Sequence, residues 1–276
     1  MSNIFDGKQI RDEILKDLAD KVVSLERKPV LAEFLIGDDP VSAAYAELKR
    51  KIAVKIGVLF CLYKFDSDDK ESEIIEAIKF LNDDPETDGI MIQIPVPQGF
   101  DRSKLIEAIS PKKDVDGLRF CAGLDSDFRP PVVEAILEGL KRSQGILNLE
   151  SGSWEKKKIA LVGHGFLVGK PLERTLRELG IDNLSVVTSE NIQDSKFEIL
   201  DSNIIVSATG KAGIIKSEMI KEGVTLIDAG TAEENGELKG DIDPEAYEKA
   251  SYYTPVPGGI GPVTVAMLFR NLVNKK

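Results

Sequence analysis

The sequence predicts an α/β fold with two domains, each a mostly parallel sheet covered by helices, and three observations support this prediction. Short apolar segments typical of buried strands alternate with segments whose apolar residues recur at helical spacing. The chain has 276 residues, which corresponds to two domains of about 150 residues each. Near the middle, residues 147–157 are rich in Ser, Gly and charged residues, a composition typical of a surface connection.

The first half of the chain repeats a helix followed by a strand. Apolar residues at every fourth position from Ile10 to Val22 predict the first helix, and the dense apolar segment 30–37 predicts the first strand. The elements expected after them, in order, are a helix over 41–56, a strand over 58–65, a helix around 74–81, a strand over 89–96 and a helix around 105–109. This alternation favours a parallel sheet with helices on its faces.

The second half predicts another α/β unit. A helix over 132–141 follows two prolines and leads to the polar connection. The elements expected beyond it are a strand over 158–163, a helix over 168–179 and strands over 184–188, 203–208 and 224–230. The amphipathic helix of the tail is assigned to the first domain, because the second already has its strands. We therefore expect residues 1–130 and 254–276 to form one domain and residues 131–253 the other.

Composition excludes several classes of function. Lys and Arg total 36 against 47 Asp and Glu, a net charge of −11 without any Lys/Arg run, which disfavours binding to nucleic acid. Cys61, Cys121 and the single histidine, His164, are too few for a disulfide framework or a zinc cluster, so we expect no metal. The N-terminus has no long apolar run, so we expect neither a secretion signal nor a membrane span, and a cytoplasmic protein.

A glycine-rich segment follows the strand expected at 158–163. Gly163, Gly165 and Gly169 precede a helix, in the spacing G-x-G-x-x-x-G. Glycines permit a tight turn and close approach of the backbone, and a helix N-terminus offers N–H groups to an anion such as phosphate. The segment therefore predicts a nucleotide phosphate loop, although a glycine-rich turn that binds nothing stays open.

Tyr45 and Lys49 lie four residues apart on a predicted helix, so both side chains are on one face. An aromatic ring can stack on a flat substrate while the amine transfers protons, but such a pair is more often a solvated or partly packed helix face. Gln93 lies near the carboxyl end of an apolar strand, where open α/β sheets bind ligands. A buried amide bonded only to the backbone is its alternative interpretation.

Two further segments carry polar or rigid features. Asp114 and Asp116 form a carboxylate pair on a turn, which is typical of an Asx turn or a helix cap. Two carboxylates can also bind a metal, but no companion His or third acid lies at a suitable spacing. The segment 254–264, TPVPGGIGPVT, predicts a stiff loop with exposed backbone. Its alternative interpretation is a simple turn between two elements.

Taken together, these segments resemble the bifunctional methylenetetrahydrofolate dehydrogenase/cyclohydrolase family. The matching motifs, in the family's order, are GDDPVSAAYAELKRKIAVKIGV, DGIMIQIPVPQGF, PKKDVDGL, VGHGFLVGKP, ATGKAGII, TLIDAG, GDID and TPVPGGIGPVTVAML. The resemblance implies two domains around a cleft: a folate-binding catalytic domain at 1–130 and 254–276, and a Rossmann-like NAD(P)-binding domain at 131–253. It also implies a homodimer and a folate substrate.

The resemblance implies roles for individual residues. Tyr45 would stack on the pterin, Lys49 would be the central catalytic group, Gln93 would hold Lys49, and Asp116 would anchor the pterin N–H groups. Pro257, Gly258 and Gly259 would contact the substrate. The cofactor would be held by Gly163, His164, Gly165, Val168, Gly169, Ser189, Thr209 and Gly210. Hydride transfer from the methylene group would be followed by hydration to 10-formyltetrahydrofolate, in which a buried lysine can move protons near neutral pH.

Three departures from the family pattern keep alternatives open. His164 and Gly165 replace a common Arg-Ser, the segment 129–132 lacks a threonine, and Glu190 occupies a position where other members can carry a basic residue. The family favours NADP, whereas His164 and Glu190 favour NAD, so both cofactors stay possible. The alternatives are a cyclohydrolase without effective dehydrogenase activity, a non-catalytic folate-binding protein, and a different reductase of similar fold acting on shikimate-like or amino-acid substrates.

Overall fold

The computed structural model describes residues 3–145, 157–188, 190–192, 194–234 and 236–274. The chain divides into two compact units. Unit 1 comprises Met1–Arg11 and Val132–Thr264, and unit 2 comprises Asp12–Pro131 and Val265–Lys276. Two α/β units are thus confirmed. The predicted domain assignment, which changes at 130/131 and 253/254, stays a prediction about where each function lies. The expected connection lies, apart from residue 157, outside the described residues.

Unit 1 is built on a six-stranded parallel sheet with the strand order β1-β11-β8-β7-β5-β6. Its strands are β1 (Asn3–Ile4), β5 (Ile159–Val162), β6 (Leu184–Val187), β7 (Ile204–Ser207), β8 (Val224–Asp228) and β11 (Ala250–Tyr253). A separate antiparallel pair consists of β9 (Ala232–Glu234) and β10 (Glu237–Lys239). The central strands β5, β7 and β8 are buried along their whole length, which explains their uninterrupted apolar sequences.

The helices of unit 1 connect these strands. They are α6 (Pro131–Gln144), α7 (Gly169–Glu178) and α8 (Lys196–Asp201), with short 3-10 helices at Ser217–Met219 and Pro244–Lys249. The strands expected at 158–163, 184–188, 203–208 and 224–230 correspond to β5, β6, β7 and β8. The sequence did not predict β1, β9, β10 or β11, each of four residues or fewer.

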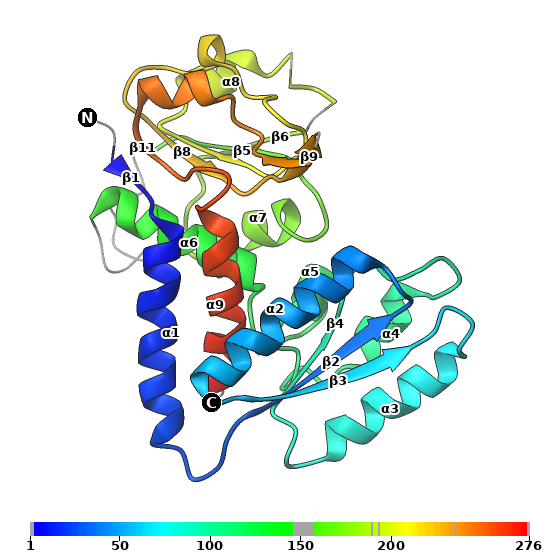
Figure 1. Ribbon diagram of the computed structural model, residues 1–276. Helices are drawn as coiled ribbons and strands as arrows, with labels where there is room; N and C mark the ends of the chain where they lie inside the picture. The colour runs from blue at the N-terminus through cyan, green and yellow to red at the C-terminus, as the bar shows by residue number, and fades with distance from the viewer. Residues whose placement is uncertain (1–2, 146–156, 189, 193, 235, 275–276) are drawn as a thin grey trace. The chain divides into compact units, whose positions relative to one another are not determined.

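Unit 2 contains a three-stranded parallel sheet in the order β3-β2-β4. The strands are β2 (Val30–Ile36), β3 (Leu59–Phe65) and β4 (Gly89–Ile92), and the helices are α2 (Pro40–Ile56), α3 (Glu71–Asp83), α4 (Arg102–Ala108) and α5 (Leu118–Cys121). In Figure 1 these strands run between α2 on one side and α3 on the other. The predicted strand over 89–96 ends earlier, because Pro95 and Pro97 have no N–H to donate to a neighbouring strand.

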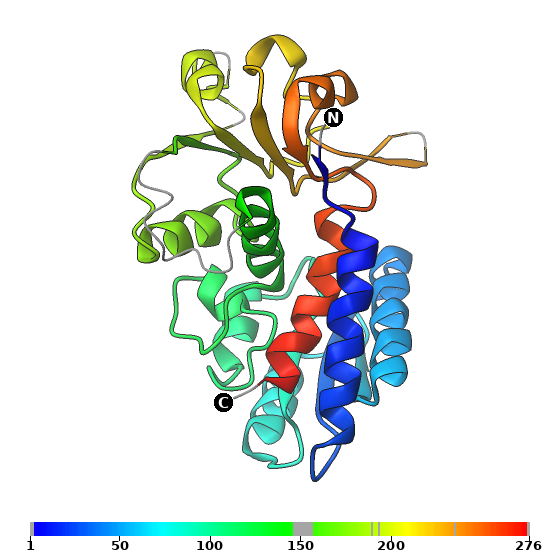
Figure 2. The ribbon, with the colours of Figure 1, turned by 90° about the vertical axis from the view of Figure 1, so that its left-hand side faces the viewer.

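Two long helices complete the core of unit 2. They are α1 (Gly7–Val23) and α9 (Ile260–Val273), which lie side by side in Figure 2. Leu18 of α1 and Phe269 of α9 belong to one buried cluster that also contains Leu31 of β2 and Ile52 of α2. The tail helix therefore packs with elements of the first half of the chain. Among the described residues, no helix combines the length and apolar composition needed to cross a membrane.

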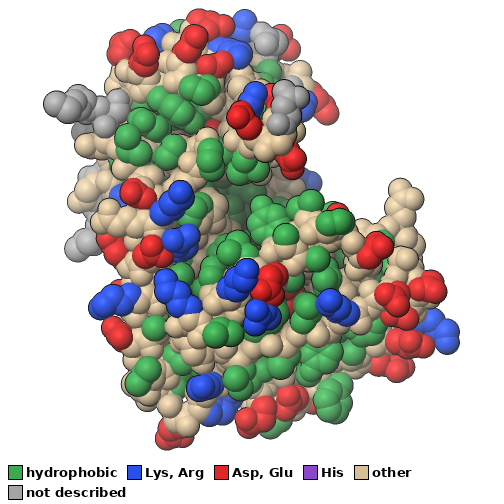
Figure 3. Space-filling view, viewed as in Figure 1, with side chains coloured by type: hydrophobic (Ala, Val, Ile, Leu, Met, Phe, Trp, Pro, Cys, Tyr) green, Lys and Arg blue, Asp and Glu red, His purple; other side chains and the backbone are tan. Residues whose placement is uncertain are grey.

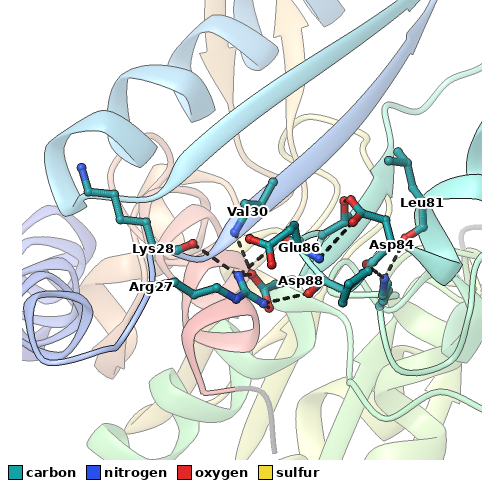
Figure 4. Close-up of polar contacts among 10 residues, drawn as sticks. Arg27, Lys28, Val30, Leu81, Asp84, Glu86 and Asp88 are labelled. Carbon is teal, nitrogen blue, oxygen red and sulfur yellow. Dashed lines mark hydrogen bonds and ion pairs between the residues drawn. The ribbon is translucent and has the colours of Figure 1, made fainter.

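A polar network ties the segments that lead into β2 and β4 to each other (Figure 4). Arg27 donates two hydrogen bonds to the Asp88 carboxylate, at 2.6 and 2.7 Å, and one to the carbonyl of Glu86 at 3.3 Å. Asp88 also accepts a hydrogen bond from the Val30 backbone N–H at 2.9 Å. A bidentate arginine–carboxylate pair has a fixed geometry. It therefore fixes the start of both strands that lead to the candidate site.

Candidate active site and cofactor loop

Helix α2 positions the predicted catalytic lysine. The helix begins after Asp39, whose carboxylate accepts a hydrogen bond from the Ser42 N–H at 2.7 Å, and Pro40 occupies its first turn. It ends at Gly57, whose φ of 83° is in the left-handed region that favours glycine. Both ends of the helix are thus fixed by local sequence, and Lys49 lies in its middle with its side chain buried.

The Lys49 ammonium lies between two side chains from the sheet. Its Nζ donates a hydrogen bond to Gln93 Oε1 at 2.7 Å, and it forms an ion pair with Glu33 Oε1, also at 2.7 Å. The side chain of Lys49 is 8% exposed and that of Glu33 is fully buried. A buried amine is costly unless it is paired, and here it is paired twice. The structure thus brings together Lys49 and Gln93 as the sequence predicted.

Gln93 is held in place by its own backbone contacts. It directly follows β4, and its N–H donates to the Phe34 carbonyl of β2 at 2.8 Å. Its side-chain Nε2 donates to the carbonyl of Ile94 at 3.1 Å. With the amide nitrogen used in this way, the amide oxygen faces Lys49. Gln93 is therefore neither exposed nor bonded only to the backbone.

Glu33 is a residue of this centre that the sequence reasoning missed. It lies in the middle of β2, between Leu62 of β3 and Met91 of β4. Burial raises the pKa of Glu33, the charge of Lys49 lowers it, and the charge of Asp116 raises it further. A single carboxylate inside the apolar strand VLAEFLI was the available signal, since acidic residues are rarely buried without a partner.

Asp114 and Asp116 have different environments. Asp114 is buried and accepts hydrogen bonds from the N–H groups of Leu118 and Arg119 at 3.0 and 2.9 Å, and from the Ser126 hydroxyl at 2.9 Å. Burial raises the pKa of Asp114 to about 7 against these bonds. It is a cap for α5. For Asp116, burial also raises the pKa while Lys49 lowers it, which places this carboxylate in the electrostatic field of the lysine.

Tyr45 lies one turn before Lys49 on α2 and is 51% exposed. A pocket of about 320 Å³ opens just beyond Gln93 in the chain. It is lined by Ile94, Pro95, Val96, Phe100, Asp101, Arg102 and Ser103. Unit 2 therefore provides an exposed ring, a buried amine and a pocket along neighbouring segments. Among the described residues, no cluster of His, Cys, Asp or Glu could hold a metal ion.

The predicted substrate loop 257–259 belongs to unit 1. The Gly258 carbonyl accepts a hydrogen bond from the Gly7 N–H at 2.9 Å. A Cβ on Gly259 would lie 2.5 Å from the Pro255 carbonyl oxygen, so only glycine fits this turn. Pro257 is exposed. The loop is thus ordered by backbone contacts within its own unit.

The glycine-rich loop between β5 and α7 also depends on close backbone packing. A Cβ on Gly163 would lie 2.4 Å from the Ala208 carbonyl oxygen, and one on Gly169 would lie 2.1 Å from the Gly163 carbonyl oxygen. Around Gly165, by contrast, no atom of the described chain lies within 4 Å of such a Cβ. Helix α7 begins after Val168 without a side-chain cap in the part of the chain that the structure describes. This open, uncapped N-terminus fits the pyrophosphate of a dinucleotide.

The His164 side chain in this loop is paired with a carboxylate. Its Nε2 lies 2.7 Å from Glu173 Oε2 of α7, and Glu173 also accepts a hydrogen bond from Arg177 at 3.0 Å. Burial acts to raise the pKa of Glu173, but the bonds from Arg177 and His164 outweigh it and lower that pKa. The sequence reasoning had His164 available for a phosphate. In the structure a carboxylate already occupies one of its nitrogens.

The buried side chain of Asp241 supports the loop after β7. Asp241 accepts hydrogen bonds from the Ser207 hydroxyl and from the N–H groups of Thr209 and Lys211, at 2.7, 2.5 and 3.0 Å. This fixes Thr209 and Gly210, both predicted cofactor residues, and Gly210 has a φ of 67°. Ser189, another predicted cofactor residue, lies outside the described residues.

Two family models match the chain over most of its length. The catalytic domain of tetrahydrofolate dehydrogenase/cyclohydrolase matches residues 5–116. The NAD(P)-binding domain of the same family matches residues 143–276. The chain belongs to the tetrahydrofolate dehydrogenase/cyclohydrolase family.

Individual relatives agree with this assignment. The bifunctional protein FolD of Bacillus licheniformis is 39% identical over 284 residues, which cover 99% of this chain and 96% of that protein. The structure of the bifunctional FolD methylenetetrahydrofolate dehydrogenase/cyclohydrolase from Campylobacter jejuni has a TM-score of 0.90 at 31% identity, covering 100% and 98% of the two chains. The Trypanosoma brucei enzyme, solved with NADP and an inhibitor, has a TM-score of 0.87 at 29% identity, covering 99% and 97%.

These matches confirm the resemblance, the two-domain α/β fold and the expected class of bifunctional folate enzyme with an NAD(P)-binding domain. They compare whole domains and chains. The roles expected for Tyr45, Lys49, Gln93, Asp116 and the glycine loops therefore stay predictions about single side chains.

Proposed function

We propose that this member of the tetrahydrofolate dehydrogenase/cyclohydrolase family oxidises 5,10-methylenetetrahydrofolate with NADP or NAD and hydrolyses the methenyl product to 10-formyltetrahydrofolate. The observation that carries the proposal is the buried Lys49 amine, 2.7 Å from both Gln93 Oε1 and Glu33 Oε1. Burying a charged amine and a carboxylate has no benefit for folding over an apolar pair of the same size. Such a centre is therefore best explained by chemistry.

The folate is held by unit 2 in this proposal. Tyr45 is exposed one turn from Lys49 and offers its ring to the flat pterin. Asp116 accepts two N–H bonds from the pterin, a charge-assisted contact that fixes its orientation. The pocket beyond Gln93, with Arg102 on its lining, suits the aromatic and carboxylate-bearing remainder of a folate.

Hydrolysis of the methenyl cation needs proton transfers, which Lys49 supplies. Water attacks the bridging carbon, and the Lys49 amine accepts a proton from it. The carbon–nitrogen bond to N5 then breaks as the lysine returns a proton to that nitrogen, and the reaction releases one proton overall. Gln93 keeps Nζ in position through both transfers, since its own amide is fixed by the backbone.

The cofactor loop of unit 1 holds the dinucleotide. Gly163 and Gly169 allow the tight turn, and the N–H groups at the start of α7 bind the pyrophosphate. A dinucleotide bound there would supply the hydride acceptor for oxidation of the methylene group. His164 and Glu173 together present little net positive charge, so any preference for NADP, with its 2′-phosphate, is modest.

Parallel assays test both activities. Purified protein is incubated with methylenetetrahydrofolate and either NADP or NAD at pH 6 and pH 8, and reduced nicotinamide and methenyl absorbance are followed separately. We expect both signals, with only a modest preference for NADP over NAD. Hydrolysis of added methenyltetrahydrofolate without oxidation by either cofactor would leave only the cyclohydrolase. The absence of both activities would contradict the proposal.

We also propose a homodimer, formed through β3. This strand lies at one edge of its sheet, and its other side has no strand partner among the described residues. Leu59 and Leu62 on β3 are 48% and 37% exposed, and Val54 of neighbouring α2 is 65% exposed. Figure 3 shows hydrophobic side chains over this region. An open apolar edge favours pairing with another strand, and a second copy offers the same strand across a two-fold axis.

Light scattering after size exclusion tests the dimer. Leu62→Lys places a charge on the edge and should shift the protein towards monomer. Phe197→Lys, at a 75% exposed position on α8, is the matched control and should leave the mass unchanged. A wild-type monomer, or a dimer that Leu62→Lys leaves intact, would overturn this interface.

We propose a cytoplasmic location as well. Cys61 and Cys121 are both free, as expected in a reducing compartment.

A further inference from the structure

Glu33 stands out as the one acidic side chain of β2. Its residue is fully buried, its neighbours across the sheet are Leu62 and Met91, and among the described residues no group other than Lys49 bonds to its carboxylate oxygens. Only the ion pair with Lys49 Nζ at 2.7 Å compensates for this burial. Backbone N–H groups, which satisfy buried carboxylates elsewhere in this protein, are absent from its surroundings in the described chain. A carboxylate placed in this way has a strong tendency to take up a proton.

The charged and polar groups around Nζ come from three segments. Glu33 approaches from β2, Gln93 from the residue after β4, and Asp116 acts on both Lys49 and Glu33 from the segment before α5. Gln93 offers an oxygen but cannot take a proton. Of the two carboxylates, Asp116 is committed to the pterin in the proposed function. Glu33 is left as the group that can exchange a proton with the lysine inside the protein.

We propose that Glu33 is a positioning residue that prepares Lys49 to act as a base by holding its proton. The proton moves from Nζ to Oε1 across the 2.7 Å contact, the N–H bond breaks, an O–H bond forms, and a lone pair is left on the amine. An ion pair becomes a neutral pair without any change in net charge. The inference rests on the proposed function, because it explains how that lysine acts in methenyl hydrolysis.

Low dielectric surroundings support this exchange. Burial costs separated charges far more hydration free energy than it costs a neutral acid and a neutral amine. Burial is also the largest influence on Glu33 and raises its pKa, which makes the protonated acid accessible. The proton stays within the pair, so the exchange itself takes no proton from solvent and gives none to it.

Glu33→Gln is the decisive variant, because it keeps the size of the side chain and cannot take the proton. Methenyl hydrolysis is measured from acid to alkaline pH with the spontaneous hydrolysis subtracted, and folate affinity is measured separately. We expect kcat at pH 7 to fall at least about tenfold, with folate Kd changed less than about threefold. The wild-type rate should be level around neutral pH, whereas the variant rate should rise with pH, because solvent then has to take the proton that Glu33 holds in the wild type.

Glu47→Gln is the matched control, since Glu47 lies on the exposed side of α2 and pairs with Arg50. It should behave as wild type. A Glu33→Gln variant with the wild-type rate and pH profile would overturn the inference. So would a lower rate with an unchanged pH profile, because it would show that Glu33 only supports the structure.

If Glu33→Gln does not fold, Glu33→Asp keeps a carboxylate in the same place. It should retain the level pH profile at a reduced rate, and a profile that climbs with pH would overturn the inference. Failure of the proposed function is distinguishable from these results. In that case the wild type itself hydrolyses no methenyltetrahydrofolate, and Lys49→Ala changes nothing.

Discussion

Asp228 in unit 1 and Glu33 in unit 2 are both buried acidic residues, but they have different bonding partners. In unit 1, Asp228 accepts hydrogen bonds from the N–H groups of Gly230, Asp241 and Ile242, at 3.0, 3.2 and 2.9 Å. A Cβ on Gly240 would lie 2.2 Å from Asp228 Oδ2, so glycine makes room for that carboxylate. In unit 2, Glu33 is equally buried but has no such donors in the described chain, and its only close partner is the Lys49 amine.

The difference separates structural carboxylates from functional ones. Backbone amides cannot change their protonation, so an acid bonded to them serves the fold. An acid paired with an amine can exchange a proton with it and is costly to retain for stability alone. By this criterion Asp114, Asp228 and Asp241 serve structure, whereas Glu33 and Lys49 are the pair that we propose serves chemistry.

Lys49→Ala should have the largest effect. We expect methenyl hydrolysis to fall by about 10²- to 10⁴-fold, the usual contribution of a positioned acid or base. Folate binding should persist, because Tyr45 and Asp116 still hold the pterin and alanine is well tolerated in a helix. Stopped-flow hydrolysis and folate titration give the two quantities. Hydrolysis near the wild-type rate would show that the assigned role of Lys49 is wrong.

Two glycine variants of the cofactor loop should have different effects, one on protein stability and the other on cofactor binding. In Gly169→Ala the new methyl group meets the Gly163 carbonyl, so we expect a lower melting temperature and loss of oxidation. In Gly165→Ala no protein atom is met, so the melting temperature should hold while KM for the cofactor rises several-fold. Methenyl hydrolysis should survive in Gly165→Ala. If Gly165→Ala leaves KM for the cofactor unchanged, the dinucleotide does not bind at this loop.

Asp228 should make stability depend on pH. Burial raises its pKa to about 7, whereas an unfolded chain has a value of about 3.9. Between these values the folded protein binds more protons than the unfolded one, so this group's contribution to stability falls as pH rises from about 4 to 7. Asn does not titrate. The stability difference between wild type and Asp228→Asn should therefore narrow from pH 5 to pH 8 in urea unfolding followed by circular dichroism, and a widening difference would contradict this.

Much of the fold could be predicted, because long elements carry a period. The helix expected at 41–56 is α2 at Pro40–Ile56, and the strand expected at 30–37 is β2 at Val30–Ile36. The strands β1 and β11 could not be predicted, because β1 has only two residues and β11, with the sequence ASYY, lacks the dense apolar run that marks β5 and β7.

The candidate site divides in the same way. The contact between Lys49 and Gln93 was implied by the family resemblance, which gives Gln93 the role of holding Lys49. The contact of Glu33 with Lys49 depends on which face of β2 lies under α2, and that of His164 with Glu173 depends on the path of a loop. Neither is encoded in local spacing.

The most direct test of the distinction between structural and functional carboxylates uses the two neighbours Asp114 and Asp116. Folate Kd and melting temperature are measured for Asp114→Asn and Asp116→Asn. We expect Asp116→Asn to weaken folate binding by about 1 to 3 kcal/mol with little change in melting temperature, because an unpaired pterin N–H is left in the site. Asp114→Asn should lower the melting temperature, since it loses backbone bonds at the start of α5, and leave folate Kd nearly unchanged. Equal losses of folate affinity at both positions would contradict the account and show that the pair only supports the turn.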